Sequence, residues 1–177
     1  SYPEFYEYLT NNIKNESTLL VKMKTEITEN TILWSDMESG LGKFTSVTDN
    51  VEEFDNFYFE LSEHLQNYLQ KENEKFSPTN DLKTKFQTDF ITISKYLRAL
   101  DKDRYNSFIR RYNFSSKDIS VITLNYTDTL EKILSLNTGV TTKSFSNNTN
   151  LRNLIHVHGR LGESIIIGVN DEGQMDN

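Results

Sequence analysis

The chain has 177 residues, of which 36% are hydrophobic and 12% aromatic, so it carries enough apolar side chain for a folded core and is not a disordered sequence. It contains no cysteine, which excludes disulfides, thiolate catalysis and cysteine-bound zinc, and no apolar run approaches the roughly 20 residues of a membrane span. The net charge of -7 is unevenly spread, because residues 1–75 carry 15 Asp and Glu against 6 Lys and Arg, whereas the rest carries 11 against 13.

Apolar residues recur at helical spacing from residue 1 to about residue 114. Separate helices are predicted from about residue 51 to residue 76 and from about residue 82 to residue 100, with Ser77-Pro78-Thr79 between them. The aromatic side chains along these helices are expected to form core. This half of the chain is therefore predicted to be a helical lobe.

The segment Trp34-Ser35-Asp36-Met37-Glu38 lies in one of these helical stretches. At 100° per residue, Glu38 falls at the margin of the apolar side, while Asp36 points roughly opposite. A carboxylate at the edge of an aromatic face makes Glu38 a candidate catalytic residue, although a salt bridge is the simpler interpretation.

A basic segment runs from residue 82 to residue 117, where nine Lys and Arg face three Asp. Such a segment, which includes Arg110 and Arg111, could bind phosphates. The simpler interpretation is a solvated helix face that complements the acidic first half, because basic residues are common on ordinary helices.

After residue 115 the pattern changes to short apolar runs of the kind found in buried parallel strands. Strands are predicted near residues 119–124, 154–158 and 164–168, with a capped helix from about Thr127 to Leu136. Residues 137–152 are predicted to be a polar surface loop, with a short strand near Val140 as the alternative. The predicted fold is α/β: the helical lobe of about residues 1–114 packs on a small, mostly parallel, Rossmann-like sheet formed by residues 115–177.

Ligands bind outside the carboxyl ends of strands in open α/β sheets, and Asn125 and His158 both occupy such ends. Asn125 could hydrogen-bond a sugar hydroxyl, and Thr127 and Asp128 could touch a ligand or simply complete the turn. His156 and His158 supply only two ligands, so no metal site is predicted. His158, beside Gly159, is the predicted general base, and His156 is given a structural role.

Five segments together resemble the AbiH family of bacteriophage abortive-infection proteins. They are Ser1-Tyr2-Pro3-Glu4-Phe5, Trp34 to Glu38 with Leu41, Leu124 to Glu131, Ile155-His156-Val157-His158-Gly159, and Ile165-Ile166-Ile167-Gly168. The resemblance spans nearly all of residues 1–177, which it identifies as a single, partial AbiH-like domain. It also implies a strand and a Gly-rich turn ahead of Ser1, so the sequence is expected to be a fragment without the segment that would bind pyrophosphate.

The AbiH family is in turn distantly similar to sirtuin-like NAD-binding domains, whose Thr-X-Asn-hydrophobic-Asp and His-Gly motifs hold nicotinamide ribose and supply the catalytic histidine. Thr123 and Asn125 match the first motif, and His158-Gly159 matches the second. Thr127 stands where the motif has Asp, and the zinc-binding cysteines are missing, which argues against deacylation. The resemblance implies NAD or another nucleotide as the ligand, with Thr123, Asn125, Thr127, Asp128 and Gly159 in the binding site.

Three functions are therefore compared. The first is a cytoplasmic anti-phage protein that binds a nucleotide and, if it is an enzyme, cleaves NAD as a glycohydrolase through His158, Asn125 and Glu38. The second is a non-catalytic sensor whose partner is a phage component or a second copy of the chain. The third, less favoured, is a nucleic-acid-binding effector that uses the basic segment. No membrane partner is expected.

Overall fold

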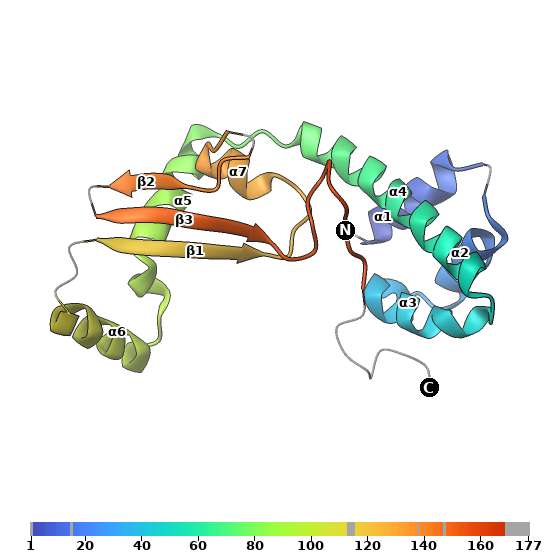
Figure 1. Ribbon diagram of the computed structural model, residues 1–177, viewed down its shortest axis with the longest axis horizontal. Helices are drawn as coiled ribbons and strands as arrows, with labels where there is room; N and C mark the ends of the chain where they lie inside the picture. The colour runs from blue at the N-terminus through green and yellow to red at the C-terminus, as the bar shows by residue number, and fades with distance from the viewer. Residues whose placement is uncertain (1, 15, 113–115, 138, 147, 169–177) are drawn as a thin grey trace. The chain divides into compact units, whose positions relative to one another are not determined.

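The computed structural model describes residues 2–14, 16–112, 116–137, 139–146 and 148–168 (Figure 1). It contains helices and a three-stranded sheet, which confirms the predicted α/β class. The chain divides into two compact units, each described by itself below: unit 1 comprises Ser1–Glu72 with Leu161–Asn177, and unit 2 comprises Asn73–Arg160. No helix within the described residues is long and apolar enough to cross a membrane.

Unit 1 is built from helices whose apolar sides form one core. The elements are α1 (Tyr2–Asn12), α2 (Thr18–Glu29), η1 (Leu33–Ser35), α3 (Met37–Phe44), η2 (Thr45–Val47) and most of α4 (Val51–Lys75), which continues into unit 2. The side chains that lose all solvent contact are Phe5, Leu9, Leu20, Met23, Met37, Phe57 and Leu61. The helical periodicity of the sequence therefore does report the core of unit 1.

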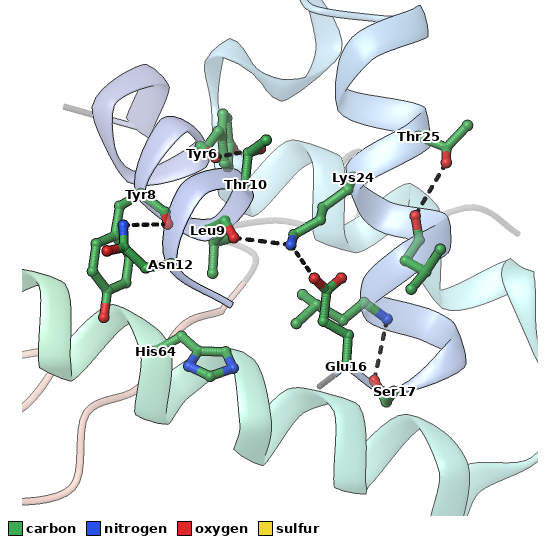
Figure 2. A network of polar contacts seen from close by, with 12 residues as sticks. Tyr6, Tyr8, Leu9, Thr10, Asn12, Glu16, Ser17, Lys24, Thr25 and His64 are labelled. Carbon is green, nitrogen blue, oxygen red and sulfur yellow. Dashed lines mark hydrogen bonds and ion pairs between the residues drawn. The ribbon is translucent and has the colours of Figure 1, made fainter. Parts of the chain in front are cut away.

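A polar network joins the end of α1 to the start of α2 (Figure 2). The Lys24 ammonium donates to the Leu9 carbonyl oxygen over 2.9 Å and lies 2.5 Å from Glu16 Oε1. The Ser17 hydroxyl accepts a hydrogen bond from the Leu20 amide over 3.2 Å and so caps α2. Lys24 thus adds a second donor to a carbonyl oxygen in the last turn of α1, which also accepts from the Ile13 amide over 3.3 Å.

Trp34 is the centre of the aromatic packing in unit 1, where it is 1% exposed. Its ring meets Tyr6 and Phe44 edge-on, with centroid distances of 6.2 and 5.9 Å. Gly40 lies so close to the indole that a Cβ built on this residue would be 2.4 Å from Trp34 Cε3. The absence of a side chain at position 40 is therefore a condition for this packing.

The strand predicted at residues 164–168 is wrong, because this segment pairs with no strand. Instead, the Ile167 amide donates to the Tyr58 hydroxyl over 2.9 Å, and that hydroxyl donates to the Ile167 carbonyl over 2.7 Å. Ile165 and Ile167 are buried and Ile166 is exposed, as in a strand. The alternation reported a half-buried extended segment, but its hydrogen-bonding partner is a side chain of α4.

Tyr68 is a buried phenol near the middle of α4, 7% exposed, whose hydroxyl donates to Glu4 Oε2 over 3.3 Å. Burial, followed by the negative charges of Glu4 and Glu72, raises the pKa of Tyr68 from 10.0 to about 12. The folded protein therefore holds this proton more tightly than the unfolded chain does.

The Tyr68 contribution to stability is expected to be complete below pH 10 and to be lost as the pH rises toward 12. The loss should be about 2 kcal/mol, from 1.36 kcal/mol per unit of pKa shift. Urea unfolding at pH 10 and near pH 12 measures it, and Tyr68→Phe, which cannot ionise at this position, should lose correspondingly less. Equal losses in the two proteins would contradict the assignment.

Unit 2 places helices on a small sheet. Its elements are α5 (Asn80–Ile91), η3 (Ile93–Tyr96), α6 (Ala99–Tyr112), β1 (Lys117–Thr123), α7 (Thr129–Leu134), β2 (Lys143–Ser146) and β3 (Thr149–His156). The strand order is β1-β3-β2, with β1 parallel and β2 antiparallel to β3. The mostly parallel, Rossmann-like sheet is thus not confirmed. The connection between β2 and β3 is too short for the crossover that a parallel pair needs, so these two strands form a hairpin.

One face of the sheet packs on α5 and α7. Leu134 of α7 and Leu151 and Leu154 of β3 form the buried centre, with partly buried side chains around them from Phe86, Phe90, Val121, Leu130, Leu136 and Phe145. On the opposite face, Ile122 and Ile155 are register partners and are 68% and 48% exposed. The sheet of unit 2 is therefore apolar on both faces near its carboxyl edge.

Candidate functional site

The carboxyl ends of β1 and β3 lie side by side, because the two strands are parallel and Thr123 is the register partner of His156. The pairing extends one bond further, where the Val157 amide donates to the Thr123 carbonyl over 3.1 Å. Asn125 and His158 each follow their strand by two residues, so unit 2 brings these two predicted site residues to the same edge of the sheet.

His156 is held by hydrogen bonds at both ring nitrogens. Nδ1 lies 2.7 Å from the Asn125 carbonyl oxygen and Nε2 lies 2.8 Å from Glu131 Oε1. The side chains of His156 and Glu131 are each 8% exposed. A carbonyl oxygen can only accept, so Nδ1 donates and Nε2 meets the carboxyl group. This buried pair fixes the strand end to α7.

Arg160 extends the pair into a charged network. Its Nε donates to Asp128 Oδ1 over 2.7 Å and lies 3.7 Å from Glu131 Oε1. Asp128 occupies the N-cap position of α7, but its side chain makes no hydrogen bond to the helix amides. The Asp128 carboxylate accepts the hydrogen bond from Arg160 instead. Sequence analysis missed Glu131 and Arg160. The available signal was the spacing of Asp128 and Glu131, which puts both acids on one side of a helix.

The other residues predicted to bind a cofactor shape the turns around this edge. Thr123 is 7% exposed, and its hydroxyl accepts a hydrogen bond from the Asn125 amide over 3.1 Å. The hydroxyls of Thr127 and Thr129 are 2.8 Å apart. Gly159 has φ +84°, in the left-handed region that favours glycine, and so turns the chain after His158. These contacts are internal to unit 2.

Asn125, Tyr126 and His158 form what we call the strand-end surface. Asn125 is exposed, and Tyr126 and His158 are half-buried. The Tyr126 and His158 rings are tilted by 42° with centroids 6.0 Å apart. A ligand would therefore meet an open surface with two flat rings and one amide.

Glu38 belongs to unit 1, whereas Asn125 and His158 belong to unit 2. It lies in the first turn of α3, is 8% exposed, and its amide donates to the capping Asp36 Oδ1 over 3.1 Å. Burial, followed by the charges of Glu38 and Asp36, raises the pKa of Tyr2. Glu38 is thus part of a polar cluster with Tyr2 and Asp36 inside unit 1.

No three His, Asp or Glu side chains are grouped so that they could hold a metal ion within the part of the chain that the structure describes. A comparison with family models matches residues 1–177 to the model described as "Bacteriophage abortive infection AbiH". No curated protein and no solved structure matches the chain.

Proposed function

We propose a function for this chain from one premise: the chain belongs to the AbiH family of bacteriophage abortive infection, whose model it matches over residues 1–177. Family membership implies a role in phage abortive infection. Within that role, our proposal is that the strand-end surface binds a nucleotide, with NAD as the first candidate.

The observation that carries the proposal is the different state of the two histidines. His156 uses both ring nitrogens inside unit 2, whereas the His158 ring contacts Tyr126 and forms no hydrogen bond with another of the described residues. A neutral imidazole at the carboxyl edge of parallel strands can accept a proton from a bound substrate or water. The exposed Asn125 amide offers both a donor and an acceptor for ribose hydroxyls.

Hydrolysis of NAD at this surface would proceed by attack of water on C1′ of the nicotinamide ribose. The bond from C1′ to the nicotinamide nitrogen breaks, its electron pair leaves with nicotinamide, and the water proton passes to His158. The products are ADP-ribose, nicotinamide and a proton. Asn125 would position the ribose, and a general base of this kind contributes about 100- to 10,000-fold to a rate.

The protein that carries residues 1–177 is expected to bind NAD in calorimetric titration and to release nicotinamide, measured by chromatography. Asn125→Ala should weaken binding at least fivefold, and His158→Ala should reduce release about 100-fold. His64→Ala, a histidine of α4 in unit 1, is the matched control and should change neither. NAD binding without nicotinamide release would contradict the proposed hydrolysis. NAD binding that is unchanged in both Asn125→Ala and His158→Ala would contradict the proposed binding site.

A non-catalytic interaction module is the second candidate. Ile122, Leu124, Ile155 and Val157 are 68%, 64%, 48% and 49% exposed around the carboxyl edge of β1 and β3. Contiguous exposed apolar side chains of this kind mark interaction surfaces. Failure to bind NAD, together with self-association that Ile122→Lys abolishes, would favour this candidate.

A further inference from the structure

A second candidate site lies at the opposite end of β1, between α5, α6 and the first residues of the strand. It is a cavity of about 450 Å3, lined by Phe90 of α5, Tyr105, Phe108 and Ile109 of α6, and Lys117 of β1, among others. Its volume falls in the range of roughly 300–1,000 Å3 that small-molecule sites occupy. The walls are mainly apolar and include the rings of Phe90, Tyr105 and Phe108, against which a flat ring could stack.

Lys117 places a positive charge at this cavity. Its ammonium lies 5.9 Å from the centroid of the Tyr105 ring. The neighbouring Asp118 is already engaged, since it accepts from Asn150 over 3.1 Å and lies 2.9 Å from Arg152 Nε. These bonds hold the pKa of Asp118 below its usual range. The charge of Lys117 is thus available to an anionic group beside the ring in the cavity.

The exposed side of α6 extends this aromatic and basic surface from Phe108, at the cavity, along the helix. One side of α6 carries Arg104, Phe108, Arg111 and Tyr112, because each of the other three is three or four residues from Phe108. The Arg104 side chain is 74% exposed, and Phe108 and Tyr112 are 51% and 54% exposed. The Phe108 and Tyr112 rings are 5.0 Å apart, and the Arg111 guanidinium lies 5.7 Å from the Tyr112 ring centroid.

The charge of unit 2 agrees with an anionic partner. Residues 73–160 contain 14 Lys and Arg against 8 Asp and Glu, a net charge of +6, whereas the whole chain carries -7. The positive charge is therefore a property of one unit, and α6 lies in that unit (Figure 1). A charge of this sign attracts phosphates, and the attraction weakens as salt concentration rises.

We propose that the α6 surface, formed by this cavity with Arg104, Phe108, Arg111 and Tyr112, binds single-stranded nucleic acid. One unstacked base enters the cavity against Phe108 and Tyr105, and its backbone phosphate meets Lys117. The neighbouring phosphates meet Arg104 and Arg111, and Tyr112 offers a face to the next base. Exposed aromatic rings interleaved with cations are how proteins bind single strands without reading their sequence. A duplex keeps its bases stacked and cannot fill the cavity in this way.

The test is fluorescence anisotropy of a labelled single-stranded RNA or DNA oligonucleotide with the full 177-residue chain, at several salt concentrations. Arg104→Gln with Arg111→Gln should weaken binding at least tenfold and reduce the slope of log Kd against log salt concentration by about 1.4. Phe108→Ala should weaken binding about tenfold, and Phe108→Trp should restore it, because stacking depends on the ring.

The matched control removes two positive charges from unit 1, by Lys14→Gln with Lys22→Gln, and should leave affinity within about twofold. Circular dichroism establishes that each variant is folded. An equal loss in the control would overturn the proposal, since net charge alone would then explain binding. Binding to duplex as tight as to single strand, unaffected by Phe108→Ala, would also overturn it, as would the absence of salt-dependent binding. Because the site lies at the other end of β1, His158→Ala should leave this binding unchanged.

Discussion

His156→Ala should lower the free energy of unfolding of unit 2 by about 3 kcal/mol, because it removes one partner of a buried pair and leaves the other unpaired. The Glu131 carboxyl loses its 2.8 Å contact and keeps Arg160 at 3.7 Å. The Asn125 carbonyl loses its donor as well. Glu131→Ala should cost a similar amount, and Glu131→Gln less, because an amide can still hydrogen-bond a neutral imidazole.

Urea unfolding gives these free energies, and hydrogen exchange of α7 and β3 amides locates them in unit 2. The matched control is His64→Ala: the His64 Nε2 atom lies 3.8 Å from Glu60 Oε1, and both side chains are more exposed, at 17% and 22%. At 3.8 Å this contact is too long for a hydrogen bond, so His64→Ala should cost less than His156→Ala. The double variant of His156 and Glu131 completes a cycle that isolates their coupling. Losses no larger than in the control would show that the pair is not desolvated.

Gly40→Ala should destabilise unit 1 by about 3 kcal/mol through overpacking. The new methyl group would lie 2.4 to 2.8 Å from three carbons of the Trp34 ring. The indole is rigid, and its contacts with Tyr6 and Phe44 prevent it from moving away from the new methyl group. The sign of the stability change distinguishes the two effects, because Ala in place of Gly inside a helix otherwise adds roughly 1 kcal/mol of stability.

Trp34 is the one tryptophan in the sequence, so its fluorescence reports this packing directly. In Gly40→Ala the emission is expected to shift to longer wavelength and the unfolding midpoint to fall. Gly168→Ala is the control, since a Cβ there would lie 3.9 Å from Ile166 Cγ2, an ordinary contact. An increase in stability on Gly40→Ala would mean that helix propensity outweighs the contact and that the packing around Trp34 is looser than described.

Local signals in the sequence were reliable where the structure depends on neighbouring residues. The apolar stripes of the first half correspond to helices, and the runs near 119–124 and 154–158 correspond to β1 and β3. Hydrogen bonds at the helix starts follow the same rule, as at Ser17, Asp36 and Thr79, whose side chains cap α2, α3 and α5. Each of these features forms within a few residues, so the sequence can encode it locally.

Pairings between distant residues followed no such rule. The alternating isoleucines at residues 164–168 predicted a strand, but whether an extended segment joins a sheet depends on which partner is available, and here that partner is Tyr58. The hairpin partner β2 lay in a segment read as a polar loop, because its residues carry few apolar side chains.

The candidate site divides in the same way. From sequence alone, Asn125 and His158 follow neighbouring strands, and the parallel pairing of β1 and β3 brings them to one edge. The sequence assigned His156 a structural role and His158 the role of general base, but only the tertiary structure supplies the hydrogen-bond partners of His156. It surrounds His156 with a carbonyl from residue 125 and a carboxyl from residue 131. Alternation along a strand determines which side a residue takes, whereas hydrogen-bond partners depend on how separate segments meet, and that is a property of the folded chain.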